Sequence, residues 1–268
     1  MNIGLIGFGT IGRAVARAVH DGRAGNAELV ALLVRDLTRV RADGLLGPAC
    51  RVTANANEFF TTDMEVVVEA AGHAALKQFA ERTLHSGRDL LAVSVGAFCD
   101  EEVLASVRRA AEESGRKLLI PSGALGALDA ISSSAVGTLD DVTLTVRKPP
   151  AAWKGTPAEQ IASSAQDKAV CIYEGRARDA ARAFPQNVNV AAALSLAGIG
   201  FDRTKIKMFA DPDVTHNTFE LVARGDFGEV KLELKNRPYP ENPKTGYLVV
   251  MSLIKSIRRL QESVIVGF

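Results

Sequence analysis

A glycine-rich turn close to the N-terminus constrains the fold of this chain more than any other feature. Gly7, Gly9 and Gly12 form a G-x-G-x-x-G run that follows the apolar segment Ile3–Ile6 and opens the amphipathic stretch Thr10–His20. In such a strand–turn–helix unit the first glycine permits the tight turn, the second lets a pyrophosphate approach the backbone, and the third lets helix and strand pack closely. The run predicts a dinucleotide-binding turn, with a glycine-rich turn that holds no ligand as the alternative.

The first helical turn after these glycines completes the expected phosphate site. Thr10 and Ile11 are its first residues, and backbone N–H groups at the start of a helix have no partner within that helix. Such N–H groups, together with the positive end of the helix dipole, favour a bound anion. We therefore expect Thr10 and Ile11 to bind the cofactor together with the three glycines.

The first half of the chain alternates short apolar runs with amphipathic stretches, which is typical of a parallel sheet covered by helices on both faces. Six strands are expected, at Ile3–Ile6, Leu29–Val34, Arg51–Thr53, Glu65–Glu69, Leu90–Ser94 and Lys117–Ile120. Helices are expected at Thr10–His20, Ala74–His85 and Asp100–Ser114. This pattern predicts an α/β domain over residues 1–122 with a Rossmann-type, doubly wound parallel sheet.

The pattern changes after Pro121. Strands are expected at Val142–Val146, Ala169–Tyr173, Thr204–Phe209, Asn217–Arg224 and Glu229–Leu234, and helices near Leu128–Ala135 and at Asn189–Ala197. This mixture predicts a second, α+β mixed-sheet domain over residues 123–240 that serves catalysis and dimerisation. A Pro-rich turn, Arg237–Pro243, precedes a final amphipathic helix, Gly246–Gln261. We expect the segment 241–268 to pack back on the first domain.

Composition excludes several classes of protein and partner. The 268 residues include 32 Lys plus Arg and 31 Asp plus Glu, a net charge of +1, so nothing global attracts nucleic acid or an anionic membrane. The three cysteines are far apart and lack a C-x-x-C spacing, which argues against a disulfide framework and a metal site. No signal peptide or stretch of about 18 apolar residues is evident. We therefore expect a cytoplasmic protein with small-molecule partners and no bound metal.

The end of the second expected strand bears on which dinucleotide binds. Arg35 and Asp36 follow that strand, where the adenosine ribose is expected to lie. An acidic side chain there accepts from the ribose hydroxyls of NAD, whereas an arginine suits the extra phosphate of NADP. The alternative is that Asp36 caps a helix beginning at Leu37 while Arg35 is solvated. The pattern favours NAD and leaves NADP as the second candidate.

Small residues follow three later strands of the first half, at Ala70–His73, Val95–Ala97 and Ser122–Ala124. Ligands of open α/β sheets lie outside the carboxyl ends of the strands, so these turns are expected to line the same crevice as the glycine run. Ala71 and Ala124 are the cofactor contacts that we infer from them. Tight turns between strand and helix, without a ligand, are the alternative.

Among the four histidines, His216 is the best candidate for proton transfer. It lies in the polar run Asp211–Thr218, which leads into a strand of the second domain, and histidine has a free pKa close to neutrality. A hydrogen-bonded structural histidine is the alternative. His20 and His85 lie near the ends of expected surface helices, and His73 follows the fourth strand, where starting a helix is as good an explanation as touching a cofactor.

Several segments together resemble the L-aspartate dehydrogenase family, over nearly the whole chain. They are Gly7–Gly12, Ile120–Ala130, Phe184–Ala192, Asp211–Asn217 and Glu241–Thr245. The resemblance implies NAD- or NADP-dependent oxidative deamination of L-aspartate to iminoaspartate, which hydrolyses to oxaloacetate and ammonia or feeds NAD biosynthesis. It also places the active-site histidine at His216 and nucleotide contacts at Ala124 and at Asn187 or Asn189, with Asn189 favoured. Helix capping is the alternative for either asparagine.

A dicarboxylate substrate also needs cationic or N–H donors. The second half of the chain offers six such cations, Arg147, Lys148, Lys154, Lys205, Lys207 and Lys244. Lys148 and Lys244 are singled out as substrate ligands because the turns that carry them look specific, while a solvated surface lysine is the alternative for each. Exposed strand edges in the second domain suggest that the protein forms a homodimer.

Two other functions compete with this interpretation. A reductase of the dihydrodipicolinate reductase type shares the two-domain plan, but that family has a paired-histidine catalytic stretch, and no His-His pair occurs here. A non-catalytic dinucleotide-binding sensor is the second competitor. The polar run around His216 argues against a sensor.

Overall fold

A computed structural model describes residues 1–40, 44–185, 188–240 and 242–267, with the backbone only at residues 243 and 244. The chain divides into two compact units. The first consists of Met1–Pro121 and Val250–Phe268, and the second of Ser122–Val249. None of the described helices is both long and apolar enough to cross a membrane.

The first unit is built on a parallel sheet of strand order β3-β2-β1-β4-β5-β6. Its strands are β1 (Asn2–Ile6), β2 (Glu28–Leu33), β3 (Arg51–Thr53), β4 (Val66–Glu69), β5 (Asp89–Ala92) and β6 (Leu118–Leu119). The chain order reverses at β1, which has β2 on one side and β4 on the other. The expected doubly wound sheet is therefore confirmed, and the reversal beside β1 creates the crevice in which such folds bind ligands.

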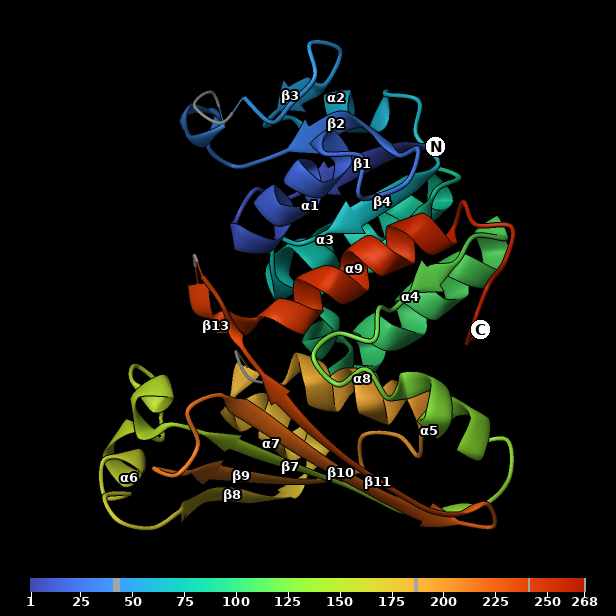
Figure 1. The fold of residues 1–268 in the computed structure, drawn as a ribbon. Helices are drawn as coiled ribbons and strands as arrows, with labels where there is room; N and C mark the ends of the chain where they lie inside the picture. The colour runs from blue at the N-terminus through green and yellow to red at the C-terminus, as the bar shows by residue number, and fades with distance from the viewer. Residues whose placement is uncertain (41–43, 186–187, 241, 268) are drawn as a thin grey trace. The chain divides into compact units, whose positions relative to one another are not determined.

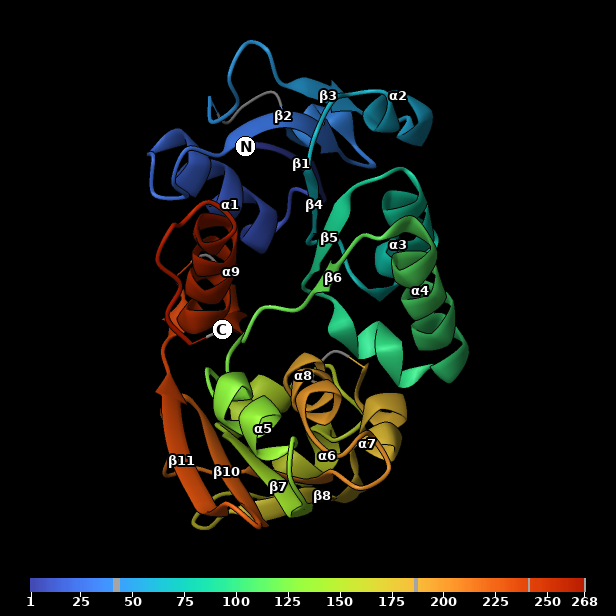
Figure 2. The ribbon, with the colours of Figure 1, turned by 90° about the vertical axis from the view of Figure 1, so that its right-hand side faces the viewer.

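Helices cover both faces of this sheet (Figure 2). They are α1 (Thr10–His20), α2 (Ala56–Phe60), α3 (His73–His85), α4 (Glu101–Ser114) and α9 (Tyr247–Arg259), with short 3-10 helices η1 (Leu37–Arg39) and η2 (Val95–Cys99). The part of α9 that belongs to this unit lies with α1 on one face, and α3 and α4 cover the other. Because both faces are covered, the central strands are mostly apolar, and all four residues of β4, three valines and Glu69, are buried.

The last helix is tied to the first unit by its own side chains. Val250, Leu253 and Ile257 of α9 are buried, and Gln261 donates from Nε2 to the carbonyl oxygen of Ala24 at 3.0 Å. The apolar spacing of three and four residues places these three side chains on one stripe of the helix.

The second unit is built on a mixed sheet of strand order β11-β10-β7-β9-β8. Its strands are β7 (Leu139–Lys148), β8 (Val170–Arg176), β9 (Lys205–Ala210), β10 (Asn217–Gly225) and β11 (Gly228–Asn236). Only β7 and β9 pair in parallel among these neighbours. One face carries α5 (Leu128–Ser134), α7 (Ala177–Ala183) and α8 (Asn189–Ala197), as Figure 1 shows. The expected second, mixed-sheet layer is confirmed.

Several short elements of the structure were not expected from the sequence. They are α2, α7, α6 (Glu159–Ala162), the 3-10 helix η3 (Pro150–Trp153) and a small hairpin of β12 (Pro238–Tyr239) and β13 (Asn242–Gly246). The hairpin falls within the Pro-rich segment Arg237–Pro243, where a turn was expected; Pro240 does lie in a turn, and the two short strands beside it were not foreseen. Pro238 is the first residue of its strand, a position where the missing N–H group does not break a ladder.

Candidate functional site

Each glycine of the N-terminal turn is required for a different steric reason. Gly7 has φ of +97°, and a Cβ there would lie 2.7 Å from the Cβ of Ala71. A Cβ at Gly12 would overlap the carbonyl oxygen of Gly7, because α1 packs closely on the end of β1. Gly9 differs, since a Cβ there would have no atom within 4 Å. The backbone at Gly9 therefore faces open space, as a bound pyrophosphate requires.

The start of α1 is equally suited to an anion. Gly9 is its N-cap residue, no side chain caps the helix, and the first turn holds no acidic residue. The first N–H groups of the helix, at Thr10 and Ile11, are therefore not taken up by a capping side chain and face no negative charge in that turn. These features fit the phosphates of a dinucleotide, and Gly7, Gly9, Thr10, Ile11 and Gly12 are the residues that would hold them.

At the end of β2, Asp36 is engaged by its own segment. Its Oδ1 atom accepts from the backbone N of Thr38 at 3.0 Å and from the Thr38 hydroxyl at 2.6 Å, so Asp36 caps η1. The Oδ2 atom lies 3.3 Å from Nε of Arg39. The hydrogen bonds from Thr38 hold the pKa of Asp36 below its usual value. Asp36 therefore has the capping role given above as the alternative, and both Arg35 and Asp36 remain exposed to a ligand.

The carboxyl end of β4 holds a buried acid that the sequence analysis missed. Glu69 is 1% exposed, and its carboxylate accepts from the backbone N of Ala71 and of Gly72 at 2.7 and 2.9 Å. Ser94, two residues after β5, donates to it from its backbone N at 3.0 Å and from its hydroxyl at 2.9 Å. Glu69 thus fixes the turn that carries Ala71 and joins it to the turn after β5. An acid directly after three valines was the signal available in the sequence.

The turn that carries Ala124 lies in the second unit and is also held by a side chain that was not foreseen. Asn236, the last residue of β11, donates from Nδ2 to the carbonyl oxygen of Ala124 at 2.9 Å. Asn236 and Ala124 are 6% and 5% exposed, respectively. Gly123 and Gly126, with φ of +60° and +67°, turn the chain on either side of this contact. The contact fixes Ala124 relative to the end of β11.

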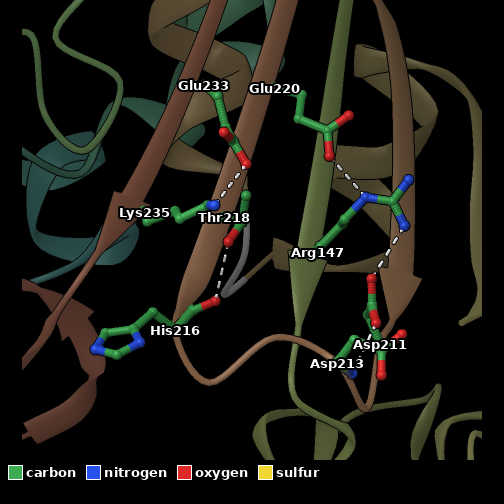
Figure 3. Close-up of polar contacts among 8 residues, drawn as sticks. All are labelled: Arg147, Asp211, Asp213, His216, Thr218, Glu220, Glu233 and Lys235. Atoms are coloured by element: carbon green, nitrogen blue, oxygen red, sulfur yellow. Dashed lines mark hydrogen bonds and ion pairs between the residues drawn. The ribbon is translucent and has the colours of Figure 1, made fainter.

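One end of the second sheet gathers most of the remaining candidates. Thr218 of β10 pairs with Arg147 of β7, so the residue that precedes β10, His216, lies at the same end of the sheet as Lys148. His216 is partly exposed, and its Nδ1 atom lies 2.6 Å from the hydroxyl of Thr215. Figure 3 shows its ring pointing away from Arg147 and Asp211. Thr215 therefore orients the Nδ1 side of the imidazole, and the ring points away from Arg147 and Asp211.

Arg147 is occupied by two acids (Figure 3). Its Nε atom donates to Glu220 at 2.7 Å and its Nη1 atom to Asp211 at 3.1 Å, while the guanidinium lies 4.8 Å from the centre of the Phe209 ring. Asp211 is 6% exposed and also accepts from the backbone N of Asp213 at 3.0 Å. Arg147 therefore braces both ends of the loop that carries His216, because Asp211 follows β9 and Glu220 belongs to β10.

Of the other cations considered, Lys148 is placed differently from a surface lysine. It is 9% exposed, and its Nζ atom lies 5.4 Å from the centre of the Trp153 ring. Burial lowers the pKa of Lys148 to about 8. Lys205 and Lys207, by contrast, form ion pairs of 2.7 Å with Asp141 and Glu174. The solvated alternative is therefore wrong for Lys148.

The structure describes the three remaining candidates to different extents. Asn187 and the side chain of Lys244 lie outside the described residues. Asn189 is the first residue of α8, after the N-cap residue Val188, and no side-chain cap is recorded among the described residues.

Comparison with known proteins gives a consistent picture along the chain. Residues 7–121 match the family model of the homoserine dehydrogenase NAD-binding domain, and residues 129–260 match the model of the aspartate dehydrogenase C-terminal region. An L-aspartate dehydrogenase of Methanosarcina barkeri is 38% identical and is aligned over 100% of this chain and 99% of its own length. The chain belongs to the L-aspartate dehydrogenase family. A relative of this name from Cupriavidus necator is also 38% identical, over 96% of both chains.

The fold agrees with this membership of the L-aspartate dehydrogenase family. The crystal structure of an aspartate dehydrogenase from Thermotoga maritima superposes with a TM-score of 0.80 at 25% identity, covering 100% of this chain and 99% of the other. The family resemblance noted in the sequence is confirmed, and so is the class of cofactor, a nicotinamide dinucleotide.

Proposed function

We propose that this member of the L-aspartate dehydrogenase family oxidatively deaminates L-aspartate to iminoaspartate, using NAD or NADP. Iminoaspartate then hydrolyses to oxaloacetate and ammonia or is consumed in NAD biosynthesis. The observation that carries the proposal is the 38% identity to a named L-aspartate dehydrogenase over the whole chain. The glycine turn supports it independently, because its open backbone at Gly9 and its uncapped helix suit a dinucleotide.

In this proposal the first unit binds the cofactor through Gly7–Gly12, with Ala71 beside the turn and with Arg35 and Asp36 near the ribose. Contacts from Ala124 and from Asn187 or Asn189 complete the proposed set. When bound, the cofactor would supply the nicotinamide ring that accepts the hydride from C2 of the substrate. We favour NAD over NADP because Asp36 presents a carboxylate where the ribose hydroxyls are expected.

The second unit supplies the proposed proton transfer and charge recognition. His216 accepts the proton that the substrate amine loses as the C=N bond forms, directly or through water, and later activates water for attack on the imine. The Thr215 hydroxyl lies 2.6 Å from Nδ1 of His216 and orients the imidazole ring. Lys148 and Lys244 bind the carboxylates by charge-assisted hydrogen bonds. The Arg147 brace limits the motion of the loop that carries His216.

A direct assay tests the proposal. The protein is mixed with L-aspartate and either NAD or NADP at alkaline pH, and the near-ultraviolet absorbance of the reduced nicotinamide is followed. Reduction that depends on L-aspartate supports the proposal. Cofactor binding without reduction would favour the sensor function, and reduction with another amino acid but not with L-aspartate would overturn the substrate. A reductase of the dihydrodipicolinate type would oxidise the reduced cofactor with a cyclic imine instead.

The cellular setting stays a prediction. We expect a cytoplasmic homodimer that recognises its small-molecule substrate without nucleic acid or membrane. Light scattering after size-exclusion chromatography measures the oligomeric state.

Gly9→Ala is expected to weaken cofactor binding without destabilising the fold. The backbone at Gly9 has φ of −77°, which alanine adopts readily, and the added Cβ would meet no protein atom within 4 Å. It would instead occupy the space through which a pyrophosphate approaches, so we expect the Kd for the cofactor to rise roughly tenfold or more. Fluorescence titration with reduced cofactor measures this Kd, and thermal unfolding checks the fold.

Gly12→Ala is the matched control for this experiment. Its Cβ would overlap the carbonyl oxygen of Gly7, so this variant is expected to lower the unfolding temperature, unlike Gly9→Ala. Unchanged cofactor affinity in a folded Gly9→Ala protein would contradict the proposed pyrophosphate position.

Asp36→Ala is expected to shift cofactor preference toward NADP. The change removes a negative charge that would repel a 2′-phosphate and frees Arg39, which lies 3.3 Å from Asp36, to bind one. We expect the ratio of the NAD and NADP values of kcat/KM to fall by about tenfold, which is 1.4 kcal/mol. Steady-state kinetics with both cofactors measures this ratio.

The matched control is Thr38→Ala, which removes the hydroxyl donor to Asp36 at 2.6 Å but leaves the charge in place. It is expected to keep the preference of the unaltered protein. Equal ratios in the Asp36 variant and the unaltered protein would remove Asp36 from cofactor discrimination.

A further inference from the structure

Glu69 is a buried acid that the proposed reaction does not use. It ends β4, the strand next to β1, and pairs with Ile6 of β1 on one side and Ala92 of β5 on the other. With 1% of its surface exposed, its carboxylate is shielded from water. No salt bridge to Glu69 is found within the part of the chain that the structure describes. An isolated carboxylate in such a place needs an explanation beyond packing.

The hydrogen bonds donated to Glu69 favour an ionised carboxylate. Oε1 accepts from the backbone N of Ala71 and of Gly72, and Oε2 accepts from the backbone N of Ser94. Backbone N–H groups can only donate, so both oxygens have to accept. Burial raises the pKa of Glu69, while these hydrogen bonds and that from the Ser94 hydroxyl oppose the shift. These donors stabilise the charged form of Glu69 where the described residues provide no salt bridge to it.

The position of this charge relative to the cofactor follows from the order of the strands. The adenosine ribose is expected at the end of β2, and the pyrophosphate at the turn after β1. The nicotinamide half therefore belongs beyond β1 on the other side, where β4 and β5 end. Glu69 and Ser94 lie at those two strand ends, and Ala71, which Glu69 holds, abuts Gly7 of the pyrophosphate turn.

We propose that Glu69 supplies a fixed negative charge that favours the oxidised, positively charged nicotinamide over the reduced, neutral one. This proposal rests on the proposed cofactor function of the first unit. Glu69 acts through space and through the turns that it holds, so it is a positioning and electrostatic residue that does not touch the substrate. Its charge sets how tightly the protein holds NAD⁺ relative to NADH, and so how easily the bound cofactor is reduced.

Two substitutions separate the charge from the geometry. Glu69→Gln removes the charge but keeps the length of the side chain, whereas Glu69→Asp keeps the charge and shortens the side chain. Both disturb the hydrogen bonds to Ala71, Gly72 and Ser94, so both are expected to weaken cofactor binding. Only the loss of charge is expected to change the ratio of the Kd for NAD⁺ to the Kd for NADH.

Equilibrium titrations measure this ratio without turnover. Fluorescence titration gives the Kd for NADH, and displacement of NADH gives the Kd for NAD⁺, both at one pH near 8. In Glu69→Gln the ratio is expected to rise by about tenfold, because loss of the negative charge weakens binding of the positively charged form and not of the neutral one. In Glu69→Asp the ratio is expected to stay at its original value.

The outcomes separate this proposal from its premise. If the unaltered protein binds neither form, the proposed cofactor function falls, and this inference falls with it. If both forms bind but Glu69→Gln leaves their ratio unchanged, Glu69 only shapes the turns and the inference alone is overturned. If Glu69→Gln does not fold, Glu69→Ala is used as a second neutral variant, and circular dichroism checks its fold. The same rise in the ratio of the two Kd values is expected of Glu69→Ala.

Discussion

His216→Ala is expected to lower kcat for L-aspartate oxidation by about 10²- to 10⁴-fold, the usual loss when an acid–base group is removed. The Kd for the cofactor is expected to change little, because His216 is not among the residues proposed to contact the cofactor. Stopped-flow measurement of nicotinamide reduction reports kcat, and fluorescence titration reports the Kd. Near-normal turnover in this variant would remove His216 from the mechanism.

Two further variants define what His216 does. Thr215→Val removes the hydroxyl that lies 2.6 Å from Nδ1, so the ring loses its orientation but keeps its chemistry. A smaller fall in kcat is expected, since orientation contributes only part of the effect. His85→Ala is the matched control, because His85 lies at the end of α3 and contacts Glu113 at 3.2 Å on the surface. Turnover is expected to be retained in the His85 variant.

Lys148→Met is expected to raise KM for L-aspartate by roughly 10- to 100-fold at pH 7. A hydrogen bond to a charged group contributes about 1.5–3 kcal/mol, and each 1.4 kcal/mol corresponds to tenfold in binding. Lys205→Met is the matched control, since Lys205 lies on the same sheet but pairs with Asp141 at 2.7 Å. Its KM is expected to stay unchanged, and an equal rise in both variants would contradict a specific role for Lys148.

The same lysine predicts a dependence of KM on pH. Burial lowers the pKa of Lys148 to about 8, so the side chain loses its charge as the pH rises through that value. The KM of the unaltered protein for L-aspartate is therefore expected to rise between pH 7 and about pH 9.5. Lys148→Arg keeps its charge over this range and is expected to show a flat KM.

Stability gives an independent check on Lys148. Because its pKa falls from the usual 10.5 to about 8 on folding, the folded state gains stability as the pH rises from about 8 toward 10.5 and loses it in the opposite direction. Lys148→Met lacks this penalty and is expected to be at least as stable as the unaltered protein at pH 7. Thermal unfolding at several pH values measures the difference, and shows that a raised KM does not come from an unfolded variant.

Local sequence pattern was enough to predict the elements whose residues interact mainly with their neighbours. The helices Thr10–His20 and Asn189–Ala197 and the strand Arg51–Thr53 have the expected bounds. The helix α2 was missed because five residues are too short to show a helical period. Asn55, whose side chain accepts from the backbone N of Asn57 at 2.8 Å, is the capping signal that precedes α2.

The candidate site was predictable where a motif is local and not where partners are distant in sequence. The glycine turn lies within six residues, but Glu69 meets Ser94 25 residues later, and Asn236 meets Ala124 112 residues earlier. No pattern in one sequence indicates such pairs. The burial of Lys148, in contrast, could have been predicted from local pattern. Lys148 follows Leu144 and Val146 at a spacing of two, and all three side chains are buried on one face of β7.

The position of the last helix has a consequence for synthesis of the protein. The first unit combines Met1–Pro121 with the chain from Val250 onward, and it includes the buried face of α9 and the bond from Gln261 to Ala24. A ribosome that has made the six parallel strands has therefore not yet made the helix that covers part of them. The apolar surface that Val250, Leu253 and Ile257 cover stays open while the whole second unit is translated, and the nascent chain depends on α9 to close it.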